Sequence, residues 1–397
     1  MSKSYFTGLL FLFILAHTGH HLVSSLLTPL LPFIRDDFGM TYTQTGWLVS
    51  AFSLTYGISN LPGGWLADRV GPRVVLTFGV AGVALAGVFA ALSINFYMLA
   101  LFLMLMGISG GGYHPSAAPL ISASVKPEKR GWAFGLHQVG GSTSFFIAPL
   151  LAAGIAGALG WRGAFIAVAI PTLVFGILFY VLLGRLGETG RGIKNGTDGT
   201  EKQIHRQYKI QTAKGYMPRL IAILVIGVAG MALMMSITSF VPLFAVDNYG
   251  ISEKAAAASI TVYFMGGLWG GPLGGYLADR IGKVIVMLIV GLIGAPTIYL
   301  MNIAPFGIAF YAVLITLGTL VNMSLPVVEA YIMDYCPDKH RSTVLGIYYF
   351  GSRGGTGVAA PILGYLIDHY GFYTGFSAVG IALATTTLIC AVVLWKS

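Results

Sequence analysis

Five histidines, one glutamate and one arginine interrupt apolar stretches of this 397-residue chain, and these side chains could do chemistry. An imidazole can donate and accept hydrogen bonds, attract an anion once protonated, or bind a metal ion. A buried carboxylate can exchange a proton, and a guanidinium keeps its charge and therefore requires an anionic partner. The candidates are His17, His20, His21, His114, His137, Glu329 and Arg353.

Three of these histidines share one helical face, because His17, His20 and His21 follow an i, i+3, i+4 spacing. At about 100° per residue this face, extended by Ser24, Ser25 and Thr28, covers roughly 140° of arc. We expect it to line a substrate cavity; the alternative is that these histidines hydrogen-bond to neighbouring helices and fix their packing. Such spacing can also chelate a metal ion, but no carboxylate or cysteine in the stretch joins them, so no metal site is predicted.

The segment GGGYHPS (110–116) combines three glycines with a titratable ring and a helix breaker. The glycines permit close approach of a neighbouring helix, and Pro115 removes one backbone donor and bends the helix. His114 therefore lies at a bend. There it either contacts an anionic substrate and exchanges protons, or it satisfies the freed backbone carbonyl. Tyr113 either donates its hydroxyl to a substrate or packs.

Two later segments add further candidates. His137 and Gln138 lie in GLHQVGG, where substrate contact and packing are both open. Arg353, in FGSRGGTG, is the basic side chain deepest within an apolar stretch, and its partner is either Glu329 or a substrate carboxylate, phosphonate or sulfonate. Asn322 precedes Glu329 by seven residues on the same helical face and could line the same wall, while Glu329 could couple transport to protons.

The elements that position these residues are predicted to be membrane-spanning helices. The chain is 56% hydrophobic and only 9% charged, with a mean hydropathy of +0.80, whereas soluble proteins carry about 25% charged residues. Spans of about 20 apolar residues are expected near 6–34, 44–67, 74–94, 96–124, 131–157, 161–184, 218–245, 255–278, 284–303, 305–333, 342–368 and 371–395. The predicted fold is all-α, with six-helix bundles at 1–184 and 218–397 joined by a polar cytosolic linker at 185–217.

The basic residues support this topology. With both termini cytosolic, all of the 23 lysines and arginines lie on the cytosolic side except Arg35, Arg162, Lys254 and Arg353. The positive-inside rule predicts this asymmetry for an inner-membrane protein. The basic residues behind the net charge of +9 therefore lie mostly at one membrane face, and the charge does not indicate nucleic-acid binding.

The two halves resemble each other. DDFGMTYTQTG through GGWLADRVG (36–71) aligns without gaps to DNYGISEKAAA through GGYLADRIG (247–282), and KRGWAFG (129–135) matches HRSTVLG (340–346). Within this repeat, we expect the first glycine of each loop to allow close helix approach, the aspartate to cap the next helix and pair with arginines, and the last glycine to supply the turn. The loop residues are Gly64, Asp68, Arg69, Gly71 and Arg73, and Gly275, Asp279, Arg280 and Gly282.

This doubled loop resembles the signature of the major facilitator superfamily, and the resemblance covers the whole chain. It implies two bundles related by a pseudo-two-fold axis, transport by alternating access, and a latch role for the loop residues. It also implies that the first, fourth, seventh and tenth spans line the cavity. One chain supplies both bundles, so a monomer is expected. Locally, AHTGHHL (16–22), YHPSAAP (113–119) and GLHQVGGSTS (135–144) are similar to the fosmidomycin-resistance type of efflux carrier.

The sequence thus predicts a secondary active transporter for a small, anionic organic solute, with proton coupling through Glu329 or His114. Alternatives are a metal-ion carrier that uses the histidine face and a non-transporting membrane sensor. No Ser/His/Asp set and no H-E-x-x-H motif appears, so neither an enzyme nor a cofactor is predicted.

Overall fold

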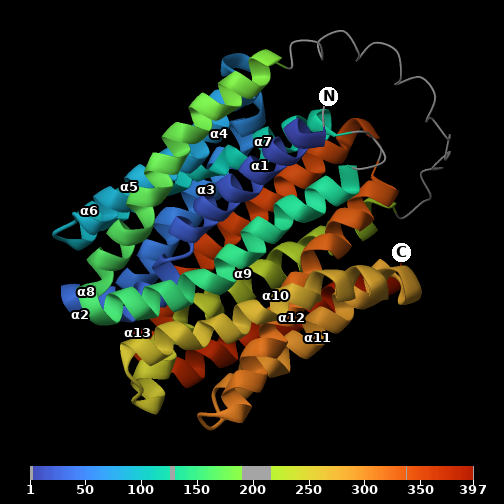
Figure 1. Ribbon diagram of the computed structural model, residues 1–397. Helices are drawn as coiled ribbons and strands as arrows, with labels where there is room; N and C mark the ends of the chain where they lie inside the picture. The colour runs from blue at the N-terminus through green and yellow to red at the C-terminus, as the bar shows by residue number, and fades with distance from the viewer. Residues whose placement is uncertain (1–2, 126–129, 190–215, 337, 397) are drawn as a thin grey trace.

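The computed structural model describes residues 3–125, 130–189, 216–336 and 338–396, and this part of the chain is helical without strands. Long helices run side by side (Figure 1), and both termini lie on the right of that view. We call this the terminal end, and the opposite end, which holds the turn between α2 and α3, the distal end. The predicted all-α fold is confirmed.

The first half begins with α1 (Lys3–Ser24), α2 (Leu27–Phe38) and α3 (Tyr42–Val70). It continues with α4 (Pro72–Thr77), the π-helical η1 (Phe78–Gly82), α5 (Val83–Ala91), α6 (Phe96–Gly111), α7 (Tyr113–Ser124) and α8 (Arg130–Thr189). The second half contains α9 (Tyr216–Tyr249), α10 (Glu253–Ile281), α11 (Lys283–Met301), α12 (Ile308–Tyr335) and α13 (Asp338–Lys396). The expected linker at 185–217 falls largely outside the described residues.

Local sequence signals explain where several helices begin and break. The side chains of Thr41, Asn95 and Ser252 accept hydrogen bonds from backbone N–H groups at the starts of α3, α6 and α10. The 60-residue α8 and the 59-residue α13 each bend at a glycine with positive φ, 71° at Gly160 and 77° at Gly371. Each of these long helices therefore consists of two successive helical segments.

Eight segments of the described chain are long and apolar enough to cross a membrane: Gly8–Phe38, Pro72–Ala91, Phe96–Ala117, Trp132–Arg185, Met217–Tyr249, Lys283–Met301, Ile308–Tyr335 and Thr343–Trp395. Trp132–Arg185 and Thr343–Trp395 contain the bends at Gly160 and Gly371. The expected count of twelve follows if these two are divided at their bends and the 29-residue helices α3 and α10 are added.

The halves meet tightly at the distal end. Arg35 of α2 forms an ion pair with Asp247 of α9, and the Tyr42 hydroxyl donates to the same carboxylate at 2.5 Å. The backbone N–H groups of Tyr42 and Thr43 each donate to Asp368 of α13 at 2.8 Å. These contacts join the start of α3 to the second half and close this end of the bundle.

The repeated loops are positioned alike in both halves. Gly71 and Gly282 end α3 and α10 with φ values of 91° and 96°, which confirms that they supply the turn. The prediction for Gly64 and Gly275 was wrong by one residue. A Cβ at Gly64 would have only an ordinary contact, 3.9 Å to Pro115, and one at Gly275 would meet nothing within 4 Å.

The close approach instead occurs at the preceding glycines. A Cβ at Gly63 would lie 2.8 Å from the Gly112 Cα, and one at Gly274 would lie 2.6 Å from the Met323 backbone oxygen. One residue rotates a side chain by about 100° around a helix, so the contact face belongs to Gly63 and Gly274 rather than to their neighbours.

The predicted capping role of Asp68 and Asp279 is not observed, because neither α4 nor α11 has a side-chain cap at its N-terminus. Arg69 instead lies over the Trp65 ring, 4.2 Å from its centroid, and Arg280 over Tyr276 at 4.8 Å. The Nε–H of Arg73 donates to the Tyr180 carbonyl at 2.9 Å, and this bond joins the start of α4 to the last part of α8. In this conformation these arginines contact their own half.

Candidate functional site

Five histidines that are far apart in sequence meet in the first half. His17, His20 and His21 of α1 face His114 of α7 and His137 of α8. The His17 and His137 rings stack at 4.1 Å between centroids, and the His17 and His114 rings meet edge to face at 5.1 Å. We call these five residues the histidine cluster. The structure thus brings together five candidates that the sequence offered from three separate segments.

Backbone carbonyls fix two of the rings. The Nδ1–H of His17 donates to the His137 carbonyl at 2.7 Å, and the Nδ1–H of His20 donates to the Gly79 carbonyl at 2.8 Å. A carbonyl oxygen can only accept, so each neutral ring carries its proton on Nδ1. Gly79 lies in η1, where the π-helical geometry alters the usual backbone pairing; such bulges are frequent at functional sites.

Burial separates the members of the cluster. His17 and His20 are 1% and 0% exposed, so in this conformation they hold helices together and do not line an open cavity. His21 and His137 are also buried, whereas His114 is partly exposed. The packing alternative thus describes His17 and His20, and His114 is the most exposed member of the cluster.

Tyr113 is the aromatic centre of this packing. Its ring stacks on His20 at 4.7 Å and on His17 at 5.6 Å, it is fully buried, and its hydroxyl lies 3.5 Å from the Phe13 carbonyl. Of the two readings that the sequence left open, packing is the one observed. Gln138, beside His137, is exposed.

The break at GGGYHPS explains how His114 reaches the cluster. The helix stops at Gly112, between α6 and α7, which agrees with the predicted bend. A Cβ at Gly110 would lie 2.9 Å from the Tyr56 ring, and one at Gly111 would lie 2.7 Å from the Tyr56 backbone oxygen, so only glycines admit α3 here. Close packing and the helix break together bring α7 against α1.

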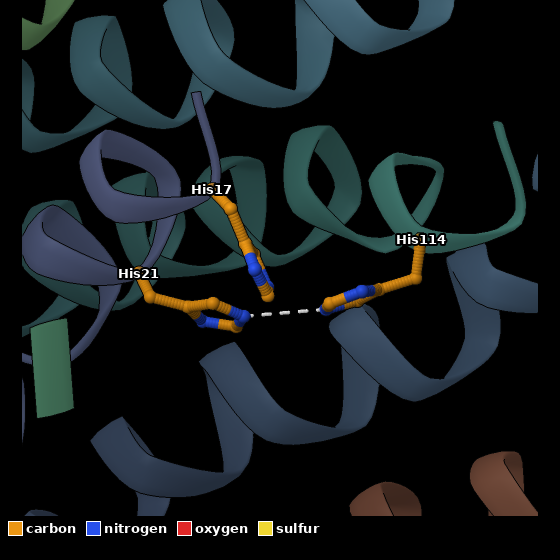
Figure 2. A group of neighbouring side chains, drawn as sticks. All are labelled: His17, His21 and His114. Atoms are coloured by element: carbon orange, nitrogen blue, oxygen red, sulfur yellow. Dashed lines mark hydrogen bonds between the residues drawn. The ribbon is translucent and has the colours of Figure 1, made fainter. Parts of the chain in front are cut away.

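The rings of His17, His21 and His114 lie close together, and nitrogens of His21 and His114 face each other (Figure 2). The Nε2 atoms of His21 and His114 are 3.2 Å apart. The Nε2 of His17 is buried and has no hydrogen-bond partner. One ligand nitrogen from each of the three rings lies within 4.8 Å of the others. The group consists of three imidazoles, which can bind a metal ion in their neutral form, and it contains no carboxylate.

Arg353 of α13 approaches the cluster from the second half. Its guanidinium carbon lies 5.6 Å from the centroid of the Tyr56 ring, and its charge acts electrostatically on His20, His21 and His114. Among the described residues no carboxylate lies within ion-pair distance of Arg353. The sequence offered Glu329 as one of two partners, and the structure does not pair them.

Glu329 is instead held by Tyr349, whose hydroxyl donates to Oε1 at 2.5 Å. Both residues line a hollow of ≈ 360 Å³ together with Pro326, Ala330, Met333 and Leu345. Asn322 lies apart from this hollow: its amide donates to the Gly318 carbonyl at 2.8 Å, and the side chain packs on Gly267 of α10. The expected shared wall of Asn322 and Glu329 is therefore absent.

Sequence reasoning missed Tyr56, Gly79 and Tyr349. Tyr56 connects the two halves of the site, since its hydroxyl lies 3.4 Å from His20 Nε2 and its ring lies beneath Arg353. Tyr56 is one of five aromatic residues in α3, and nothing in the sequence distinguishes it from the others. The π-helix at Gly79 has no signature in the apolar sequence around it.

The all-helical fold with long apolar spans is that of an integral membrane protein. The chain belongs to the Major Facilitator Superfamily, whose sequence profile matches residues 13–260 and 223–397. It is therefore a transporter and not an enzyme.

Two relatives are named as transporters, and a solved structure has the same fold. The chain is 28% identical to the probable sulfoacetate transporter SauU of Cupriavidus necator, across 86% of this chain and 83% of that protein. It is 24% identical to the glycerol-3-phosphate transporter of Bacillus subtilis, across 91% and 86% of the two chains. The crystal structure of a bacterial homolog of the human lysosomal transporter Spinster superposes with a TM-score of 0.80 at 18% identity, and covers 99% of this chain and 97% of that one.

Proposed function

We propose that the protein transports a small organic anion and that Arg353 binds the anionic group. The observation that carries this proposal is a guanidinium between the halves with no carboxylate within ion-pair distance among the described residues. Such a charge is costly inside a membrane unless an anion meets it. Two relatives are named for transport of sulfoacetate and glycerol-3-phosphate, which are both anions.

The surrounding groups suit this role. The Tyr56 ring beneath Arg353 orients the guanidinium, and His114 offers a further donor from the opposite half. Two parallel N–H groups of arginine match the oxygens of a carboxylate, sulfonate or phosphonate. Substrate binding between the halves would link the site to the rocking of two bundles.

We further propose that the protein lies in the inner membrane with both termini in the cytosol. It would act as a monomer whose two bundles comprise residues 1–184 and 218–397. The closed distal end would then face away from the cytosol. Export is the proposed direction, which rests on the similarity of 16–22, 113–119 and 135–144 to the fosmidomycin-resistance type of carrier. Protonation of Glu329 or His114 would provide coupling, since both are ionisable groups beside a hollow or a partly exposed cluster.

The test is transport of labelled sulfoacetate and glycerol-3-phosphate by the purified protein in liposomes, with a lipophilic cation as the competing class. We expect exchange of an anion by the wild type, a loss of about tenfold or more in Arg353→Ala, and partial retention in Arg353→Lys, which keeps the charge but not the fork. Exchange of the cation alone, or equal anion exchange by Arg353→Ala, would overturn the proposal.

A further inference from the structure

His17 carries a lone pair that nothing in its surroundings uses. Its Nδ1–H donates to the His137 carbonyl, so its Nε2 is the unprotonated nitrogen. That Nε2 is buried without a hydrogen-bond partner, in a residue that is 1% exposed. A buried acceptor without a donor is unfavourable, and a bound water or ion is one explanation for such a group.

The neighbouring pair has the spacing of metal ligands. The Nε2 atoms of His21 and His114 are 3.2 Å apart. Two nitrogens bound to tetrahedral Zn²⁺ at about 2.0–2.1 Å are separated by about 3.3 Å. We propose that His17, His21 and His114 bind a divalent transition-metal ion through their Nε2 atoms. One ring nitrogen from each of the three histidines already lies within 4.8 Å of the others, so closure around an ion needs only small ring movements.

The second shell supports this assignment. Metal-binding histidines commonly donate their other ring N–H to a carbonyl or carboxylate, which orients the ring and fixes its tautomer. His17 makes such a bond to the His137 carbonyl. His20, by contrast, has Nδ1 on the Gly79 carbonyl and Nε2 3.4 Å from the Tyr56 hydroxyl. His20 therefore belongs to the same cluster without being a ligand.

The ligand set also specifies the class of ion. Three imidazoles favour Zn²⁺, Co²⁺, Ni²⁺ or Cu²⁺ and discriminate against Mg²⁺ and Ca²⁺, which prefer oxygen ligands. Three protein ligands leave a fourth position open, as in zinc sites that bind a further small molecule. His114 is the partly exposed member, so the open position lies on its side of the cluster.

A hydrogen bond between His21 and His114 is the competing explanation. One of the two rings would donate its Nε2–H to the other at 3.2 Å, with no ion present. That arrangement satisfies these two rings but leaves the His17 Nε2 without a donor. A metal ion accounts for all three nitrogens at once.

The metal site shares His114 with the proposed anion site but does not use Arg353, and the experiment separates the two. Intact protein in detergent is stripped with a chelator and titrated with Zn²⁺, with Mg²⁺ as the control ion. We expect one Zn²⁺ per chain, with affinity at least tenfold weaker in His114→Gln and in His21→Gln. Unchanged affinity is expected in His369→Gln, an exposed histidine on α13. Arg353→Ala removes a nearby positive charge and is expected to bind Zn²⁺ at least as tightly as the wild type.

Substitution of Co²⁺ tests the wild type without any variant, because bound Co²⁺ with nitrogen ligands in a tetrahedral site gives intense visible absorption. The proposal is overturned if folded wild-type protein binds neither Zn²⁺ nor Co²⁺. It is also overturned if His114→Gln and His21→Gln bind Zn²⁺ as tightly as His369→Gln.

Discussion

The two halves of the molecule share backbone contacts between helices but differ in the polar residues of the candidate site. In the first half a Cβ at Gly107 would lie 2.5 Å from the Phe52 backbone oxygen. In the second half, 211 residues later, a Cβ at Gly318 would lie 1.8 Å from the Tyr263 backbone oxygen. The repeat therefore preserves the positions where helices touch through their backbones.

The polar residues do not follow the repeat. At the same offset, the positions of His17, His20 and His21 are occupied by Val228, Met231 and Ala232. Conversely, Arg353 corresponds to Ser142 in the first half. Backbone contacts depend on shape, which both halves must satisfy, whereas a binding site needs each polar group only once. The first half contributes the imidazoles of the histidine cluster, which can be neutral, and the second half contributes the permanent positive charge of Arg353.

The shared packing gives the largest expected effect on stability. Gly107→Ala and Gly318→Ala each force a methyl group against a backbone oxygen, and we expect each to cost about 1–3 kcal/mol. Gly275→Ala has open space around it and should be neutral or slightly stabilising, because alanine favours helix. Melting temperatures in detergent provide the measurement. If Gly107→Ala and Gly318→Ala melt with the wild type, the packing equivalence of the halves is wrong.

The difference in polar residues can be tested by placing a residue of the second half at the equivalent position of the first half. His20→Met places the residue found at position 231 into α1 and removes the donor to the Gly79 carbonyl. A buried carbonyl left without a donor costs about 1–3 kcal/mol. We expect a lower melting temperature for His20→Met than for the control Met231→Leu, which conserves volume. Equal melting temperatures would show that the Gly79 bond contributes nothing.

The distal end offers a matched pair of carboxylates at equivalent repeat positions, Asp36 and Asp247, and both bind Arg35. Asp247 pairs with Arg35 across the halves, whereas Asp36 pairs with Arg35 within the first half, and the Asp247 side chain is 27% exposed against 51% for Asp36. A partly exposed pair contributes about 1 kcal/mol or less. Asp247→Asn should therefore open the distal end more than Asp36→Asn does, as measured by labelling of a cysteine introduced at position 43. The reverse order would contradict the assigned closure.

Position 253 gives the smallest expected effect. Glu253 lies in the first turn of α10, outside the expected span 255–278, where burial and the nearby Asp36 carboxylate raise its pKa. A raised carboxyl pKa means that the folded, closed protein binds the proton more tightly. Its contribution to stability is present below the ordinary pKa of about 4.3 and is lost as the pH rises through the raised pKa.

Glu253→Gln should remove this dependence. The difference in melting temperature between wild type and Glu253→Gln should be small near pH 4 and should favour the variant at pH 7. A wild type that gains stability relative to the variant as pH rises would contradict the assigned direction.

Much of the fold followed from patterns that act locally. Apolar runs, the turn glycines Gly71 and Gly282, and the break at 110–116 each depend on residues near one another in the chain. The histidine face of α1 was also visible, because helical spacing places His17 and His21 together. The family's loop signature then supplied the arrangement of the two halves.

The details of the site depend on contacts that no local pattern encodes. Whether Gly63 or Gly64 touches its neighbour depends on one residue of helix rotation. The Tyr56 ring meets Arg353 across the interface between the halves, and Tyr349 holds Glu329 from the adjacent helix. Such pairings follow from tertiary packing, so the sequence could name Arg353 and Glu329 as candidates but could not choose their partners.

The most direct test of the anion site is a thermal-shift comparison of wild type and Arg353→Ala, with Arg353→Lys as the matched control. Carboxylates, sulfonates, phosphonates and lipophilic cations would be screened, since a ligand that binds only the folded protein raises its melting temperature. The account predicts stabilisation of the wild type by an anion, a weaker shift in Arg353→Lys and none in Arg353→Ala. Equal stabilisation of Arg353→Ala by the same anion, or stabilisation of the wild type by cations alone, would contradict it.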